Sequence, residues 1–331
     1  MQSQLDPSVI APRGPADAAG PTVASPAPTG RRRPRRDLLP YFLMAPAVII
    51  VLGLMAYPLY RLVVLSLQRT SLAGRFSVAG PTVKFVGFAN FEQVLGDGVY
   101  WQVILHTVLF TAVAVVLSMG ISLSVALLMR RVSGWVRIVM TVALVFVWAI
   151  PAIVATQVFE WLIDSDFGVV NYMIGKVPGV NFDHHSWFST PLQGWSVITV
   201  LVLWGAIPFL ALTLYAGLTQ VPPELVEAAT LDGAGPWQVL RNVILPVLRP
   251  VLIITTTLSV IWDFGLFNQI FVLRNTQPEQ AYWNVAIYAY EKAFAQSNYN
   301  AGATITLVTT VLMIGVMVFY IRQMIRIGEA D

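Results

Sequence analysis

Residues 221–250, VPPELVEAATLDGAGPWQVLRNVILPVLRP, form a long polar, turn-rich stretch between two hydrophobic segments of the chain. Pro222 and Pro223 are typical of a first helical turn, where a missing backbone N–H costs little. Gly233 suits the left-handed residue that ends a helix, and a second helix is predicted from about Pro236. The stretch therefore indicates two short helices that meet at a glycine.

The two predicted helices differ in the character of their side chains. Glu224 and Glu227 place negative charge near the start of the first helix, where the positive end of the helix dipole lies. The second helix is expected to carry an apolar edge and to end at Pro246, because proline removes a helical hydrogen bond. The side chains of that edge are Trp237, Leu240 and Ile244.

This stretch resembles the EAA loop of permease subunits from binding-protein-dependent, ATP-driven importers. The match begins at Glu227-Ala228-Ala229, continues with Gly233 after three residues, and ends with Val243-Ile244-Leu245-Pro246 after nine more. The family usually has isoleucine at position 243. The resemblance implies that a separate ATPase subunit docks on the loop, through Glu227, Ala228, Ala229, Gly233, Leu245 and Pro246.

The composition is that of a membrane protein. Of the 331 residues, 56% are hydrophobic and 11% are charged, a balance that one soluble core does not accommodate. The chain has no cysteine, which excludes disulfides and thiolate chemistry. Five arginines between residues 31 and 36 lie directly before a hydrophobic segment, a placement that favours a role in membrane topology over nucleic-acid binding.

Six apolar segments are long enough to cross a bilayer as helices, a crossing that takes about 20 residues. They lie near residues 39–67, 103–129, 138–163, 195–219, 247–273 and 301–321. Interior prolines such as Pro46, Pro58, Pro151 and Pro208 predict kinks in some of them. The predicted fold is an all-α integral membrane protein with six transmembrane helices and a cytoplasmic coupling loop.

The domain organisation and orientation follow from composition and charge. Residues 1–37 are rich in Pro, Ala, Gly and Ser and predict a disordered, basic cytoplasmic tail, followed by a permease domain over residues 38–331. If the N-terminus is inside, 13 of the 20 Lys and Arg residues lie on the cytoplasmic side. This bias predicts a multi-pass protein of the cytoplasmic membrane with both termini and residues 221–250 inside. The first two of the longer external loops are expected to hold short interfacial helices.

ATP hydrolysis is not expected in this chain. A phosphate-binding loop requires Gly, four residues, and then Gly-Lys-Ser/Thr, whereas the Gly175-Lys176 pair is followed by Val177 and lacks the earlier glycine. ATP and Mg²⁺ are therefore expected on a partner subunit, and this chain is expected to be a transport protein and not an enzyme. It is expected to hold no cofactor.

Asp263 lies in the fifth apolar segment, where a carboxylate costs about 2.5–3.5 kcal/mol unless it faces a cavity or a partner. Ser259 and Phe267 stand four residues on either side, and one helical face would present all three side chains. Such a mixture suits a hydroxyl-rich ligand, because a carboxylate accepts hydrogen bonds from hydroxyl groups and a ring stacks on sugar C–H faces. The alternative is a hydrogen bond between helices without a ligand.

The resemblance extends to the spans that would line a transport cavity. The run SVIWDFGLFNQIFVL around Asp263 is similar to the fifth span of carbohydrate permeases, which implies substrate contacts from Ser259 and Asp263. By the same resemblance, Trp148 before a proline, and Trp204 with Gly205, fall where the family lines its cavity. Ordinary packing of helices through small residues remains the alternative for these positions.

Other polar groups carry weaker signals. Glu160 sits near the outer end of its span, where its carboxylate can reach headgroup water. Asp164 and Asp166 lie in a loop rich in Ser, Asp and Gly and are expected to support turns. His184 and His185 are adjacent and do not show the spacing of metal ligands, so neither a metal site nor a catalytic site is predicted.

The resemblance implies an assembly. Its members pair with a second homologous permease, two ATP-binding-cassette ATPase subunits and an extracytoplasmic solute-binding protein, within membrane lipid. A neutral mono- or disaccharide is the expected cargo, because no arginine lies deep in the spans to pair with phosphate. The main alternative is a lone secondary transporter or channel for a small polar solute. An integral-membrane enzyme is a further alternative, but the sequence lacks a convincing acid–base pair.

Overall fold

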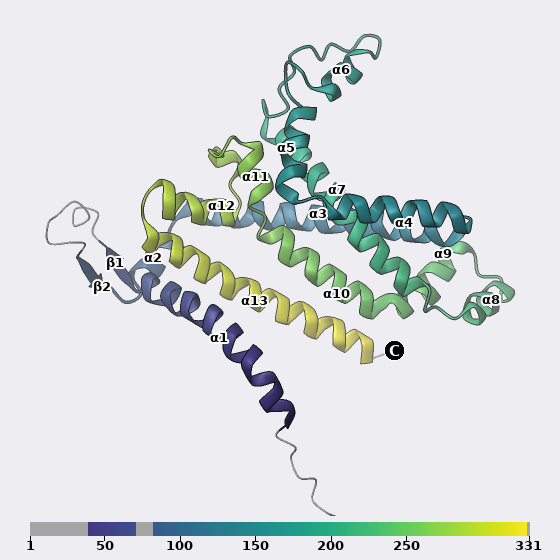
Figure 1. Ribbon diagram of the computed structural model, residues 1–331, viewed down its shortest axis with the longest axis horizontal. Coiled ribbons are helices and arrows are strands. Elements are labelled where there is room, and N and C mark those ends of the chain that lie inside the picture. The colour runs from purple at the N-terminus through teal and green to yellow at the C-terminus, as the bar shows by residue number, and fades with distance from the viewer. Residues whose placement is uncertain (1–38, 71–81, 330–331) are drawn as a thin grey trace, which may run out of the picture. The chain divides into compact units, whose positions relative to one another are not determined.

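The computed structural model describes residues 39–70 and 82–329 (Figure 1). The predicted tail, residues 1–37, lies outside these described residues, and its boundary with the permease domain stays a prediction. Internal packing divides the chain into two units, Met1–Leu54 and Met55–Asp331, and this division falls inside the first long helix. The packing, cavities and hydrogen bonds described below belong to the second unit.

Helices dominate the described chain (Figure 1). The long helices are α1 (Leu39–Ser66), α3 (Gly98–Arg131), α4 (Gly134–Ala149), α5 (Ala152–Leu162), α7 (Pro191–Leu218), α10 (Leu245–Phe264) and α13 (Tyr299–Glu329). Shorter elements are α2 (Ala89–Leu95), α6 (Val169–Gly175), α8 (Pro223–Leu231), α9 (Pro236–Val239), α11 (Asn268–Leu273), α12 (Val285–Tyr290), the 3₁₀ turn η3 (Gln280–Tyr282) and the π-helical turns η2 (Leu240–Ile244) and η4 (Glu291–Ala295). One hairpin pairs β1 (Gln68–Thr70) with β2 (Val83–Phe85).

The described residues contain five helices long and apolar enough to span a membrane, or six if a bent helix pair counts as one span. The predicted all-α membrane fold is therefore confirmed. The short helices α2 and α6 lie in the first and second predicted external loops, as expected.

The third predicted span, residues 138–163 with a kink expected at Pro151, is broken more sharply than predicted. The chain turns by 96° between α4 and α5. Pro151 lacks an N–H and disfavours helical geometry in the residue before it, and Ile150 is accordingly extended, at φ −73° and ψ 125°. By contrast, α7 continues as one helix through Pro208. Pro151 therefore lies at a break between two helices, whereas Pro208 is accommodated within one helix.

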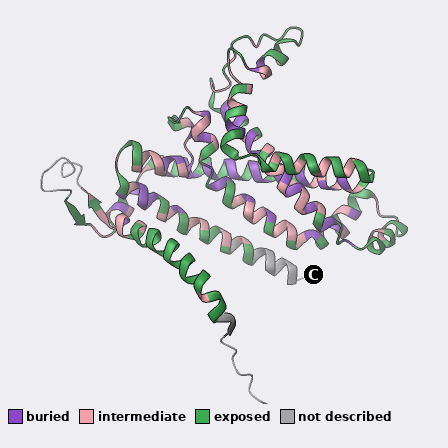
Figure 2. Cartoon of the chain, in the orientation of Figure 1, coloured by how far each residue is buried: buried purple, intermediate pink, exposed green. Residues whose placement is uncertain are grey.

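The core of the second unit lies where α3, α7 and α10 pack together, and Figure 2 shows buried residues along α3 and α7. Close approach of α7 and α10 depends on Gly217, because a Cβ added there would lie 2.8 Å from Leu248. The outer surfaces of α1 and α4 are mostly exposed and apolar, as expected for helices that meet lipid or another subunit. The packed helices α3, α7 and α10 form the frame on which the loops and cavities are built.

The loop of residues 221–250 folds as two helices that meet at a glycine. Gly233 has φ +85°, a left-handed conformation that side chains rarely adopt, and the backbone N–H of Ala234 returns to the carbonyl of Ala229 at 2.9 Å. α8 thus ends as predicted, and α9 begins at Pro236.

Two details of this loop differ from the predictions. The helix does not end at Pro246, because α9 passes through the wider turn η2 into α10, where Pro246 occupies an early position. In a π-helical turn, a backbone N–H donates to the carbonyl five residues earlier, and Leu245 N–H accordingly donates to the carbonyl of Leu240. This wider turn accommodates the missing N–H of Pro246. Glu227 lies in the second turn of α8, so Glu224 alone carries negative charge in the first turn.

Candidate functional site

A cavity of about 560 Å³ lies where two helix breaks and α7 meet. The first break separates α4 from α5, and the second separates α10 from α11 at Gly265 to Phe267. Five of the six predicted substrate residues line this one cavity. They are Trp148, Trp204, Gly205, Asp263 and Phe267.

Asp263 occupies the last turn of α10, and only 5% of its surface is exposed. It forms the C-terminal end of a polar stripe on the buried face of α10. Ser259 and Thr255 lie four and eight residues earlier on the same face. Ser259 does not line the cavity, and its Oγ atom lies buried without a hydrogen-bond partner among the described residues. The carboxylate is therefore the polar group that this stripe presents to the cavity.

Phe267 reaches the cavity by a different route from the one predicted. α10 ends at Phe264, and Phe267 has φ −123° and ψ −59°, so it does not continue the helical face of Asp263. Its ring stacks on Phe271, with centroids 4.9 Å apart, and lies 5.2 Å from the ring of Tyr290. The expected shared face is therefore wrong, although carboxylate and ring still meet at the same cavity.

Aromatic rings form much of the cavity wall. Trp148 stacks on Phe209 with centroids 6.0 Å apart, and Phe209 meets the edge of Trp262 at 5.5 Å. Trp204 packs against Phe159 at 5.6 Å. Rings fixed by other rings present defined apolar faces at little entropic cost, which suits contact with the C–H faces of a sugar.

The backbone of α7 contributes space and a polar group. A Cβ added at Gly205 meets no atom within 4 Å, so this glycine opens the cavity instead of permitting a tight helix contact. Pro208 has no N–H, and the carbonyl of Trp204 consequently lacks its partner in the helix. A carbonyl that lacks this helical partner and lies beside a cavity can accept a hydrogen bond from a ligand.

Sequence patterns did not indicate several other lining residues. The sequence does not distinguish Phe209 and Trp262 from other aromatic residues within a span. Their place in the cavity wall depends on contacts between helices. Asn268 and Gln269, at the start of α11, add amide groups. Their position three and four residues after Gly265, a helix-breaking residue within a span, is the one local signal for them.

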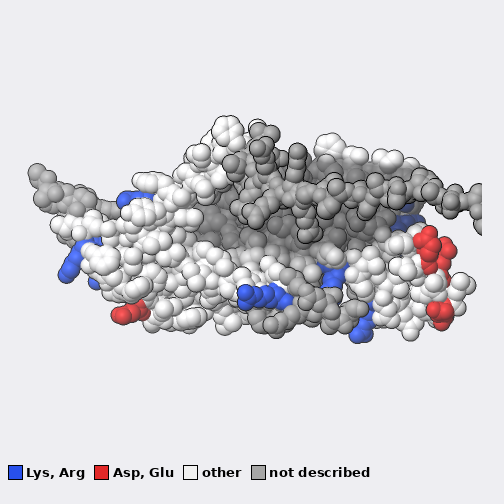
Figure 3. Space-filling model, turned by 90° about the horizontal axis from the view of Figure 1, so that it is seen from below, with Lys and Arg blue, Asp and Glu red and all other residues white. Residues whose placement is uncertain are grey.

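The predicted coupling residues lie at the far end of α10 from the cavity. Glu227 and Ala228 are exposed on α8, whereas Ala229 packs partly against the apolar cluster beneath the loop. Leu245 is half-buried and Pro246 is exposed at the start of α10. Figure 3 shows acidic residues gathered at the end of the visible face where α8 lies.

Large apolar side chains are exposed on this loop. Leu231 is 88% exposed and Trp237 is 69% exposed. A hollow of about 730 Å³ separates α8 and α9 from the end of α3, where Arg130 and Arg131 lie. Exposed apolar residues next to charged ones are typical of a protein interaction surface.

Two other predictions concern the second of the predicted external loops. Asp164 supports a turn, because its carboxylate accepts hydrogen bonds from the backbone N–H groups of Asp166 and Phe167 at 2.8 and 2.9 Å, which lowers the pKa of Asp164. His184 Nδ1 lies 2.7 Å from Asp166 Oδ1. The aspartates thus shape this loop, as expected.

Comparison with known proteins identifies the class. Residues 118–326 match the family described as binding-protein-dependent transport system inner membrane component. This match covers more than half of the chain, which therefore belongs to that family of multi-pass membrane permeases. The family predicted from the loop motif is confirmed, and the curated relatives are transport permeases and not enzymes.

The curated relatives carry the names of sugar systems. The diacetylchitobiose uptake system permease protein DasB of Streptomyces coelicolor is 35% identical over 97% of both chains. The trehalose/maltose transport system permease protein MalF of Thermococcus litoralis is 29% identical, over 89% of this chain and 96% of the relative. The chain is similar to these proteins along nearly its whole length.

A solved structure shares the fold. A bacterial ABC transporter involved in the import of the acidic polysaccharide alginate contains a chain that aligns with a TM-score of 0.71 at 17% identity, covering 88% of this chain and 96% of that one. A second structure of the alginate transporter contains a periplasmic protein with a bound pentasaccharide. Permeases of this class work with a binding protein and an ATPase.

Proposed function

We propose that this chain forms one half of the translocation path of a sugar importer and that the cavity at Asp263 contacts the sugar during passage. The observation that carries this proposal is the convergence of a carboxylate with aromatic walls at two helix breaks. A carboxylate accepts hydrogen bonds from sugar hydroxyls, and rings bind the apolar faces of the sugar. Trp148, Trp204, Gly205 and Phe267 would form the walls, whereas Ser259 lies one turn before Asp263 on α10, outside the cavity lining.

The charge of the cavity favours a neutral cargo. The described lining residues include one acidic residue and no Lys or Arg, so an anionic sugar would meet repulsion without a compensating cation. The name of the diacetylchitobiose relative makes a neutral disaccharide with N-acetyl groups the first candidate to test.

The loop would connect the chain to its source of energy. A partner ATPase carrying ATP and Mg²⁺ would dock on α8 and α9, with Glu227, Ala228, Ala229, Gly233, Leu245 and Pro246 at or near the contact. The full assembly would hold two ATPase subunits, a second homologous permease and an extracytoplasmic solute-binding protein. ATP-driven closure of the ATPases would move the loop and switch the paired bundles between inward-open and outward-open forms.

The proposed orientation places the N- and C-termini and the α8–α9 loop in the cytoplasm. The absence of native cysteine allows a direct test with single cysteines. In intact cells, an impermeant thiol reagent should label a cysteine at Gly179, whereas one at Gly235 should be shielded. Labelling at Gly235 from outside would contradict this orientation.

The function itself is tested by purification and reconstitution. A tagged chain expressed with its native partners should co-purify with an ATPase and a second permease. Proteoliposomes of this complex should take up a neutral disaccharide only when ATP and the binding protein are present. Uptake by the chain alone, without ATP, would instead indicate a secondary transporter or channel.

A further inference from the structure

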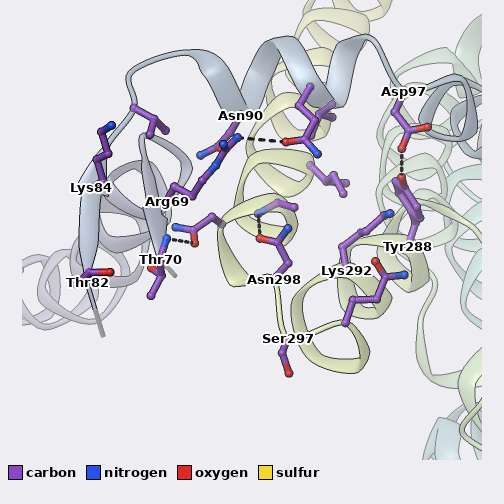
Figure 4. Close-up of a pocket in the computed structure, with 17 residues that line it drawn as sticks. Arg69, Thr70, Thr82, Lys84, Asn90, Asp97, Tyr288, Lys292, Ser297 and Asn298 are labelled. Atoms are coloured by element: carbon purple, nitrogen blue, oxygen red, sulfur yellow. Dashed lines mark hydrogen bonds between the residues drawn. The ribbon is translucent and has the colours of Figure 1, made fainter. Parts of the chain in front are cut away.

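A second large cavity, of about 760 Å³, lies at the opposite end of α3 from the coupling loop. Its walls come from the β1–β2 hairpin, α2, η4 and the first residues of α13 (Figure 4). α3 begins at Gly98 beside this cavity and ends at Arg131 beside the hollow under α8 and α9. A helix of 34 residues is about 50 Å long, so the two regions lie at opposite membrane surfaces.

Positive charge is concentrated in this cavity. Arg69 and Lys84 occupy directly opposite positions on the antiparallel strands of the hairpin. Like charges at such positions destabilise a hairpin, because they share one face of the sheet. Figure 4 shows both residues on one side of the cavity and Lys292 on the other.

These three cations lack an ion-pair partner among the described residues. Arg69 donates to the amide oxygen of Gln93 at 3.4 Å, and Lys292 lies 5.3 Å from the ring centre of Tyr288. Asp97 is the one acidic residue described in the lining, and its carboxylate is otherwise engaged.

Asp97 holds local structure together. Its Oδ1 atom caps α3 by accepting from Val99 N at 2.9 Å, and its Oδ2 atom accepts from the hydroxyl of Tyr288 at 2.6 Å. Burial, together with this hydrogen bond, raises the pKa of Tyr288, which keeps the tyrosine a neutral donor. The cavity therefore has a net positive charge that the described protein groups do not neutralise.

The backbone around Lys292 is held in an uncommon form. Lys292 lies in the π-helical turn η4, and its carbonyl accepts from Asn298 N at 2.9 Å. Ser297, which also lines the cavity, has φ +55°, although it is not a glycine. Wide helical turns and left-handed residues other than glycine are frequent at functional sites, where they place a side chain.

The cavity lies at the level of a membrane surface. α1 ends at Ser66, directly before β1, and α3 and α13 begin at Gly98 and Tyr299, which adjoin lining residues. Trp101 is 47% exposed and Tyr299 is 39% exposed close to these helix ends. Exposed Trp and Tyr at the ends of spans mark the headgroup region of a bilayer.

We propose that this cavity binds the phosphate group of an anionic phospholipid in the leaflet opposite the coupling loop. The phosphate would lie between Arg69, Lys84 and Lys292 and relieve the repulsion across the hairpin, while hydroxyl and amide groups of the lining donate to its remaining oxygens. The acyl chains would extend along the apolar surfaces of the neighbouring spans.

Titration of the delipidated, assembled importer in detergent tests this proposal. The probes are phosphatidylglycerol, phosphatidylcholine and inorganic phosphate, and the readouts are bound lipid by native mass spectrometry and the thermal unfolding midpoint. Phosphatidylglycerol should bind tightly and raise the midpoint, and the other two probes should do so weakly. Lys84→Gln and Lys292→Gln should each weaken phosphatidylglycerol binding about fivefold, the effect of one basic residue at a membrane surface.

Lys176→Gln provides a matched control, because Lys176 is an exposed cation of an external loop outside the cavity. It should bind phosphatidylglycerol like the wild type. Without lipid, Lys84→Gln should unfold at a slightly higher temperature than the wild type, because it removes the repulsion with Arg69. With phosphatidylglycerol present, Lys84→Gln should instead unfold at a lower temperature than the wild type. A lysine with a purely structural role would not produce this crossover.

Three results would overturn the proposal. Equal phosphatidylglycerol affinity in wild type, Lys84→Gln and Lys292→Gln would show that the lipid does not bind in this cavity. Equal protection by inorganic phosphate would make the cavity a site for small anions and not for lipid. Unchanged lipid binding in Lys84→Gln, together with lost stimulation of ATP hydrolysis by the binding protein, would assign the cations to that protein partner.

Discussion

The cavity at Asp263 and the loop of α8 and α9 are both built at helix ends, but their surfaces have opposite character. The cavity is lined by aromatic rings and contains a carboxylate that is 5% exposed. The loop is open, and its apolar residue Leu231 is 88% exposed. A buried carboxylate beside aromatic rings suits a small ligand, whereas exposed apolar side chains suit another protein. We therefore expect the two regions to bind different partners.

α10 connects these regions directly. It follows the loop through η2 without interruption and ends at the break beside Asp263. Its 20 residues span about 30 Å, roughly the thickness of the hydrocarbon core. A rigid helix of this length can carry a movement of the loop to the cavity wall, so changes in the two regions should have separable effects on transport and ATP hydrolysis.

The largest expected effect comes from filling the cavity. Gly205→Trp should abolish transport, because the new ring occupies the proposed path of the sugar, while the open surroundings of Gly205 let the helix form. ATP hydrolysis without sugar should continue in the assembled complex. Gly205→Ala is the matched control and should retain transport, and wild-type uptake by Gly205→Trp would show that the sugar passes elsewhere.

The next largest effect is expected at the loop glycine. Gly233→Val places a β-branched residue at φ +85°, at a cost of about 1–2 kcal/mol, and should lower transport-coupled ATP hydrolysis about tenfold. The reason is backbone strain, since a Cβ there meets no atom within 4 Å. Gly235→Val, at φ −70°, should be nearly neutral. Equal coupling in both variants would argue against a mechanical role for the α8 end.

An effect of similar size is expected from the cavity carboxylate. Asp263→Asn keeps the shape of the side chain but removes a charged hydrogen-bond acceptor, an interaction that contributes about 1.5–3 kcal/mol. Transport should fall about tenfold, and stimulation of ATP hydrolysis by sugar should fall with it. Complex assembly, measured by co-purification of the ATPase, should stay at the wild-type level. Unchanged uptake would leave Asp263 with a packing role only.

The smallest effect is expected on α8. Glu227 is exposed in the second turn, so Glu227→Ala should act through contact with the ATPase and not through the helix dipole. Assembly should weaken about two- to threefold at low salt, and the difference from wild type should shrink as salt rises. Glu224→Ala, in the first turn, should instead lower the thermal stability of the loop. A salt-independent loss in Glu227→Ala would contradict an electrostatic contact.

The sequence predicted the loop better than the cavity for a physical reason. The end of α8 depends on local signals, namely Gly233 and the prolines around it, and these act within a few residues. The continuation through Pro246 was missed, because a π-helical turn has no clear sequence signal. The 96° bend at Pro151 was underestimated for a similar reason, since the angle at a proline depends on how the neighbouring helices pack.

The cavity residues show where sequence reasoning loses information. Asp263 could be identified as a candidate from its own position, because a carboxylate within a span is costly unless it faces a cavity or a partner. Phe267 lines the same cavity as Asp263 but not from the predicted helical face, since Gly265 breaks the periodicity that links the two residues. Phe209 and Trp262 were missed, because their roles arise only when α4, α7 and α10 come together.

The central claim, that ATP acting at the loop opens the cavity, is tested most directly by thiol labelling at Gly205. The chain has no native cysteine, so Gly205→Cys provides a single reporter in the cavity. In the reconstituted complex, the rate of labelling by an impermeant reagent from the outer side should rise when ATP and the binding protein are added. The rise should disappear when Gly233→Val is combined with Gly205→Cys. A labelling rate that is unaffected by ATP, or one that still rises in the double variant, would contradict the account.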